Sequence, residues 1–240
     1  MSISPFVARV AGLVSLFTVV VTGFGFSGQP AKAITPSVET VTTTVASQFD
    51  RIVGGKNTSI SAVPWQTWVF QVTDPATGGG KACGGSLISL WVVVTAAHCV
   101  TADDGTVSND IWVFAGMGDR RHPGSNYRHA NAVYRHPGYV DGDVLNDIAV
   151  ISVISDFRAS STIRPIALPF DQDPTTWPAD GTPITVSGFG LTSTNAHNLP
   201  NILQSAKIFT LGDPLDDSSC RLWSDADQYD PSQNLCAGSP

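Results

Sequence analysis

The sequence has 240 residues, which is enough for one large domain or two small ones. Only 14% of the residues are charged and 42% are hydrophobic, and the chain contains 22 glycines and 16 prolines. This composition is rich in turns, so it favours a β-rich globular protein over a helical one. The net charge of −7 argues against general nucleic-acid binding.

Residues 1–33 have the pattern of a secretory signal peptide. Arg9 precedes an apolar run from Val10 to Phe26, and Ala31-Lys32-Ala33 matches the A-x-A cleavage pattern. An uncleaved membrane anchor is the alternative, but the run falls short of a comfortable span of about 20 residues. We therefore expect a secreted protein without stable membrane association.

Residues 34–51 are rich in Thr, Ser and Val and have no clear period, which indicates an unstructured linker. The linker ends at Arg51, and Ile52-Val53-Gly54-Gly55 follows. The two glycines permit backbone angles that are closed to other residues. An ordinary strand start after a linker is the alternative interpretation.

The sequence after residue 55 predicts short strands separated by turns. A Gly-rich hairpin loop is expected over 74–81, and the spacing of 213–223 is helix-like. The predicted strands are 67–72, 83–89, 91–98, 111–115, 130–134 and 205–209.

The stretch Trp91–Val100, WVVVTAAHCV, places a histidine at the end of a buried strand. Three consecutive valines predict the strand, and a short Thr-Ala-Ala turn then presents His98 beside Cys99. A histidine held in this way suits a general base that must not move.

The stretch Asn146–Val150, NDIAV, contains the second candidate residue, Asp147. Asp147 is a lone carboxylate ahead of an apolar run, so we expect it to be largely buried and to need a partner. A turn or strand cap is the alternative role. His98 lies forty-nine residues upstream, and the order His then Asp matches one of the known chain orders of a catalytic triad.

Four cysteines in an exported chain indicate two disulfides, for which three pairings are possible. We favour Cys83–Cys99 and Cys220–Cys236 because each pair is local in the sequence. Metal binding is the competing use of cysteines, but no CxxC or HExxH spacing is present. We therefore expect no metal and no cofactor.

A basic stretch interrupts the otherwise acidic sequence and is expected to be a solvated surface loop. An anion-binding exosite is the alternative interpretation. Its members are Arg120, Arg121, Arg128 and Arg135, interleaved with His122, His129 and His136.

Several motifs together resemble the trypsin/chymotrypsin-like serine proteases. They are RIVGG (51–55), CGGSLIS (83–89), WVVVTAAHC (91–99), HPGY (136–139), NDIAV (146–150), IRPIALP (163–169) and CAG (236–238). The resemblance implies an all-β fold of two six-stranded antiparallel β-barrels of the chymotrypsin type. Residues 52–160 would form the first barrel and 161–240 part of the second, with 181–192 as its opening strand. Phe189 stands where the family usually has Trp.

The resemblance also implies a zymogen and a mechanism. Cleavage after Arg51 would free the α-amine of Ile52, which is charged near neutral pH and can be buried against a carboxylate to order the active site. His98 would be the general base, and Asp147 would fix its tautomer. The implied partners are protein or peptide substrates, an activating protease and protein inhibitors.

The nucleophile of the family lies in a Gly-Asp-Ser-Gly-Gly stretch shortly after CAG, and no serine of this sequence has that context. We interpret the later serines as turn, strand or cap residues; they are Ser187, Ser218, Ser219, Ser224 and Ser239. We expect the sequence to be an incomplete copy, inactive as given, because an open barrel leaves unpaired sheet edges.

Two other functions compete with the protease. The first is a non-catalytic binding protein, a pseudoprotease that kept the fold, and the retained His98, Asp147 and RIVGG count against it. The second is a signal-anchored structural protein, which rests only on the apolar leader.

Overall fold

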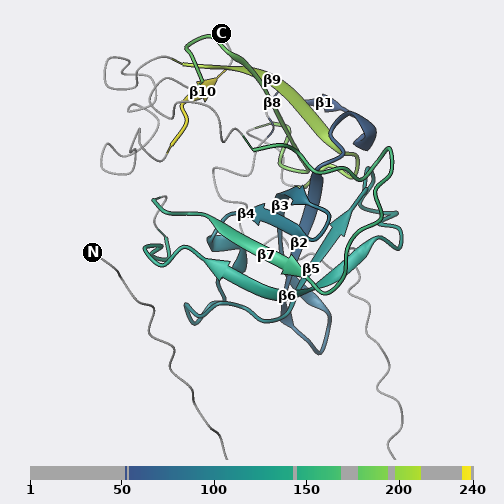
Figure 1. Ribbon diagram of the computed structural model, residues 1–240, viewed down its shortest axis with the longest axis vertical. Helices are drawn as coiled ribbons and strands as arrows, with labels where there is room; N and C mark the ends of the chain where they lie inside the picture. The colour runs from purple at the N-terminus through teal and green to yellow at the C-terminus, as the bar shows by residue number, and fades with distance from the viewer. Residues whose placement is uncertain are drawn as a thin grey trace, which may run out of the picture. The chain divides into compact units, whose positions relative to one another are not determined.

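The computed structural model describes residues 52, 54–142, 145–168, 178–193, 198–211 and 234–238. These residues form two antiparallel β-sheets, one of which closes into a barrel (Figure 1). The predicted signal peptide, the linker and the helix-like segment 213–223 lie outside the described residues. The expectation of an all-β fold is confirmed.

Six strands close the barrel in the order β2-β3-β4-β7-β6-β5, and each pairs with its neighbours in antiparallel fashion. Closure removes the free sheet edges that would otherwise invite pairing with other chains. The strands are β2 (Gln66–Asp74), β3 (Gly79–Ser89), β4 (Val92–Thr95), β5 (Ile111–Ala115), β6 (Tyr127–Arg135) and β7 (Ala149–Val153).

The turn between β2 and β3 is shorter than the predicted loop over 74–81. β3 already begins at Gly79, and Gly80 pairs with Val72. A Cβ at Gly80 would collide with the carbonyl oxygen of Gln71 and with the ring of Phe70. The glycines therefore permit close strand contact here, whereas the sequence alone suggested a loop.

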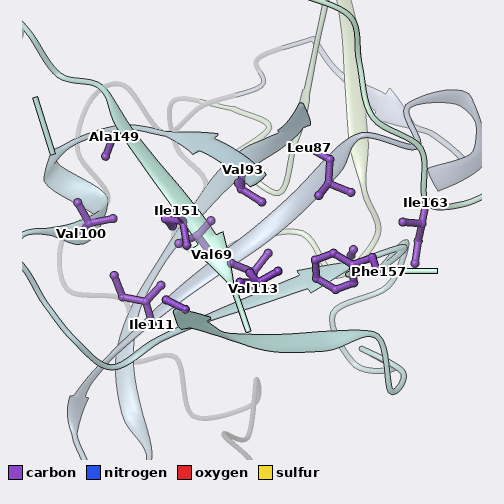
Figure 2. Packing of buried hydrophobic residues seen from close by; sticks show 13 residues of the cluster. Val69, Leu87, Val93, Val100, Ile111, Val113, Ala149, Ile151, Phe157 and Ile163 are labelled. Carbon is purple, nitrogen blue, oxygen red and sulfur yellow. The ribbon is translucent and has the colours of Figure 1, made fainter. Parts of the chain in front are cut away.

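Alternating side chains of the six strands fill the barrel (Figure 2). On β7, for example, Ala149, Ile151 and Val153 all point into this core and are 5% exposed or less. The alternation is that of strands with one buried face. The core consists of Val69, Leu87, Val93, Val100, Ile111, Val113, Ala115, Ala130, Ala149, Ile151, Val153, Phe157 and Ile163.

The second sheet is built around β9. Its strands are β1 (Lys56–Asn57), β8 (Pro183–Gly188), β9 (Gln204–Thr210) and β10 (Ala237–Gly238), and the other three all pair with β9. Residues 56–57 thus join this sheet, although the sequence placed 52–160 in the first barrel. The short β1 finds its hydrogen-bonding partners on β9, and the barrel itself begins at Gln66.

A second apolar cluster contains side chains of both the barrel and the later segments. Trp68 of β2 meets Phe189 edge to face, with ring centroids 5.3 Å apart. Phe189 therefore keeps an aromatic side chain at a position where the family usually has Trp. Arg120 lies over Trp68 and donates to the carbonyl oxygens of Leu199 and Pro200.

The basic stretch is not a continuous surface loop, because part of it forms β6. Arg121 pairs with Asp119, while Arg128 lies over the ring of Phe157. Arg135 donates to Thr101 Oγ1 and to the Gly105 carbonyl oxygen. Arg128 and Arg135 thus contact other parts of the barrel, whereas Arg121 pairs with its sequence neighbour Asp119. Within the part of the chain that is described, no helix has the length and apolar character needed to cross a membrane.

The core predicts a matched pair of stability effects near the end of β7. Ile151 is fully buried, whereas Ile154 is 62% exposed. Ile151→Ala should lower the free energy of unfolding by about 2–5 kcal/mol, because it removes apolar contacts and leaves a cavity. Ile154→Ala should change it by less than about 0.5 kcal/mol. Urea denaturation of both variants checks this, and equal losses would contradict the assignment of the core.

Candidate active site

His98 lies directly after β4, in the short 3-10 helix η3 (His98–Val100). Its neighbours Ala97 and Cys99 are buried, so the turn is anchored to the barrel on both sides of the histidine. A disulfide joins Cys99 to Cys83 of β3. The His98 side chain itself is 46% exposed, so a rigid backbone presents an accessible imidazole.

Asp147 lies just before β7, the strand that pairs with β4. In this antiparallel pair Thr95 is opposite Ala149. The residues that follow β4 and those that precede β7 therefore emerge at the same end of the barrel. This register brings His98 and Asp147 together, although 49 residues separate them in the sequence.

The Asp147 carboxylate accepts two hydrogen bonds from His98. The backbone N–H of His98 donates to Oδ1 at 2.8 Å, and Nδ1 of the imidazole lies 2.7 Å from Oδ2. Burial raises the pKa of Asp147, but the hydrogen bonds from the His98 side chain and backbone lower it by more. The net effect is a pKa below the usual range of an aspartate, so the carboxylate is ionised at neutral pH.

The expected burial of Asp147 is only partial, since 22% of its side chain is exposed. Asp147 precedes the first barrel residue of β7 and so lies at the rim of the barrel. The expected need for a partner is met by His98.

The other imidazole nitrogen, Nε2 of His98, lies 3.3 Å from Cys99 Sγ and 3.8 Å from Cys83 Sγ. In the described part of the chain, these three residues form the one group of His, Cys or acidic side chains that is compact enough to hold a metal ion. The two sulfurs are joined in a disulfide, so they are not thiolates and cannot serve as metal ligands. The group does not fit a metal site.

A second His–Asp pair provides a useful contrast. His129 Nε2 lies 3.2 Å from Asp110 Oδ1, the same oxygen that accepts a hydrogen bond from Trp112 Nε1. The His129 ring also packs edge to face on Trp112. This pair braces the outside of β5 and β6 and lacks the second, backbone hydrogen bond that His98 supplies.

The structure describes only some of the remaining predicted site residues. Cys236 is disulfide-bonded, and its predicted partner Cys220 lies outside the described residues. Ser187 donates to Gln66 Oε1 at 2.7 Å, a contact between strands β8 and β2. Arg51 and the serines at 218, 219, 224 and 239 also lie outside the described residues. Ile52 is described, and its backbone N–H donates to the Leu191 carbonyl oxygen at 2.7 Å.

Two features of the site were missed by the sequence reasoning. The backbone N–H of His98 is the second donor to Asp147, and no residue type in a sequence indicates such a contact. Asn146 has a φ of 57°, which is uncommon for a residue other than glycine. The enrichment of Asn at such backbone angles is the signal that could have drawn attention to it.

The depressed pKa of Asp147 predicts a pH-dependent stability effect. The carboxylate is stabilised in the folded state, so its contribution is present above the unfolded pKa of about 4 and is lost as the pH falls through the folded pKa. Asp147→Asn should therefore lower the free energy of unfolding by about 1–2 kcal/mol at pH 6, and by less at pH 3. Urea denaturation across this range measures it, and a constant difference would contradict it.

Comparisons with known proteins identify the family of the chain. The Trypsin family model matches residues 52–240. Trypsin alpha of Drosophila erecta is 35% identical over 158 residues, covering 66% of this chain and 56% of that protein. The chain thus spans little more than half the length of this relative.

Two solved structures share the fold at low sequence identity. The structure of GrC matches with a TM-score of 0.64 at 21% identity, and the match covers 79% of this chain and 76% of the GrC chain. Neuropsin, a serine protease expressed in the limbic system of mouse brain, has a TM-score of 0.60 at 22% identity, with coverages of 78% and 75%. These likenesses support the two-barrel chymotrypsin type of fold. Together with the match of the family model over residues 52–240, they establish that the chain belongs to the trypsin/chymotrypsin-like family of serine proteases.

Proposed function

We propose that His98 and Asp147 are the general base and the orienting carboxylate of a secreted serine endopeptidase that cleaves proteins or peptides. The observation that carries the proposal is the pair of hydrogen bonds, 2.7 and 2.8 Å long, from His98 to one carboxylate. The bond to Nδ1 orients the imidazole, and the bond from the backbone N–H holds the carboxylate against the turn that carries it. Membership of the trypsin family supports peptide-bond hydrolysis as the reaction.

In the proposed mechanism Nδ1–H donates to Asp147, so the lone pair of the neutral imidazole is on Nε2. Nε2 takes the proton of a serine hydroxyl as its oxygen attacks the scissile carbonyl. The imidazolium then gives this proton to the leaving amine, and Asp147 stabilises the positive charge in between.

The third member of the triad is not assigned to any residue of this sequence. No serine here lies in a Gly-Asp-Ser-Gly-Gly context, and Ser187 is engaged with Gln66 in a contact between β8 and β2. The proposal therefore rests on the His98–Asp147 pair and on the family match, and labelling by a serine-directed phosphonate would identify the nucleophile.

The proposal includes secretion and activation by proteolysis. Residues 1–33 act as the signal peptide and 34–51 as the propeptide, and an activating protease cleaves after Arg51. Gly54 has a φ of 75°, and a Cβ at Gly55 would lie 2.6 Å from Ile52 Cγ2. Both glycines are thus used by the backbone around Ile52, which supports a role for RIVGG beyond an ordinary strand start. Protein inhibitors would act on the activated form.

The triad assignment predicts large kinetic effects in the protein cleaved after Arg51. His98→Ala and Asp147→Asn should each lower kcat by about 10⁴-fold, because the first removes the base and the second its correct tautomer. Asp110→Asn is the matched control, since it disrupts the other His–Asp pair. It should leave kcat unchanged. Hydrolysis of peptide substrates and labelling by a serine-directed phosphonate are the measurements.

The same assay separates the protease from a pseudoprotease on the same fold. If the cleaved wild-type protein neither hydrolyses peptides nor reacts with the phosphonate, the binding protein becomes the better assignment. Equal losses in Asp110→Asn and Asp147→Asn would also contradict the proposed roles, because they would point to a general structural effect.

Activation after Arg51 predicts a site-specific loss. Arg51→Gln should prevent a trypsin-like activator from generating activity, because the scissile bond then lacks its basic residue. Arg158→Gln, at an exposed arginine of the barrel region, should be activated normally. Amino-terminal sequencing of the product should begin at Ile52, and activity without that new terminus would contradict the zymogen proposal.

A further inference from the structure

Asn146 has an unusual backbone conformation immediately before Asp147. Its φ of 57° is the one positive value found at a residue other than glycine in the described part of the chain. L-residues avoid this left-handed region because Cβ approaches the following carbonyl oxygen, and Asn tolerates it better than most. Such a conformation persists where the surrounding contacts hold it.

Contacts on both sides of Asp147 hold this conformation. The Asn146 side chain donates from Nδ2 to the Gly138 carbonyl oxygen at 3.2 Å. The N–H of Ile148 donates to the Asn146 carbonyl oxygen at 2.8 Å, which makes a three-residue turn with Asp147 at its centre. The N–H of His136 then donates to the Ile148 carbonyl oxygen at 3.0 Å, next to the β6–β7 pair Arg135–Ala149.

This turn decides where the carboxylate points. Asp147 must reach the backbone N–H and Nδ1 of His98 at the same time, with distances of 2.8 and 2.7 Å. A single rotation of the Asp147 backbone would move both oxygens together. The β7 ladder holds the chain after Asp147, and the left-handed, hydrogen-bonded Asn146 holds it before.

We propose that Asn146 is a positioning residue, whose left-handed backbone and side-chain hydrogen bond to Gly138 aim the Asp147 carboxylate at His98. This inference rests on the proposed function of the His98–Asp147 pair and extends it to the residue that precedes Asp147 in the chain. Gly138 leaves room for this hydrogen bond, because a Cβ at that position would lie 3.2 Å from Asn146 Nδ2 and 3.3 Å from the His136 ring.

Two substitutions separate the backbone from the side-chain contribution. Asn146→Ala disfavours the left-handed backbone and removes the donor, whereas Asn146→Gly keeps the backbone angle accessible and removes only the donor. Asn131→Ala is the matched control, at an exposed asparagine of β6. All three are made in the protein cleaved after Arg51, and urea denaturation verifies that each variant folds.

We expect Asn146→Ala to lower kcat by about 10-fold to 100-fold with little change in KM, because a small misplacement of a catalytic group is enough for such a loss. Asn146→Gly should lose less, and Asn131→Ala should match the wild type. The NMR resonance of the proton on His98 Nδ1 should move in Asn146→Ala and stay in Asn131→Ala, which a purely structural role would not produce.

The proposal is overturned if Asn146→Ala keeps both the wild-type kcat and the wild-type Nδ1–H resonance, or if Asn131→Ala loses as much. If the cleaved wild-type protein is inactive, that result contradicts the proposed function rather than the role of Asn146. In that case the Nδ1–H resonance still decides whether Asn146 positions Asp147, so the two failures are distinguishable.

Discussion

The candidate active site depends on the antiparallel pairing of β4 with β7. Thr95 and Ala149 are opposite each other, so the chain leaves β4 and enters β7 at one end of the barrel. His98 and Asp147 are each within three residues of this pair. A shift of the register by two residues would carry the carboxylate about 7 Å along the strand, beyond hydrogen-bonding reach of the imidazole. The barrel core, which the inward residues of β7 help to fill, is what resists such a shift.

The two His–Asp pairs of the barrel show why a short distance alone does not make a site. Asp110 shares one oxygen between His129 and Trp112, and the pair braces two strands. Asp147 instead uses both oxygens on one residue, and its ionised form is favoured despite its partial burial. A neutral histidine held by an ionised carboxylate is a base that gains stabilisation when it accepts a proton. The geometry of the second pair serves packing.

The strands were the easiest part to predict. Runs such as IWVFA and VVVT are apolar and β-branched or aromatic, and they occur in the structure as β5 and β4. The glycine-rich stretch was harder, because Gly80 signals a loop by its type and yet permits close strand contact in the structure. The expectation of a surface loop over the whole basic stretch was wrong in part, because residues 127–135 form strand β6. Charged residues suggest a solvated loop. Arg128 and Arg135, however, lie on this strand, and their long side chains contact carbonyl oxygens and a ring nearby.

The sequence by itself favoured a β-rich class and the Cys83–Cys99 pairing, both of which the structure confirms. It also identified His98 and Asp147 as candidates, because each is encoded in a short run of residue types. The tertiary structure alone decided that the pair meets, that a backbone N–H provides the second hydrogen bond, and that Asn146 adopts a left-handed backbone beside it. These facts depend on strand register and on contacts between residues far apart in the chain. Local composition does not specify such contacts, since they form only when the barrel closes.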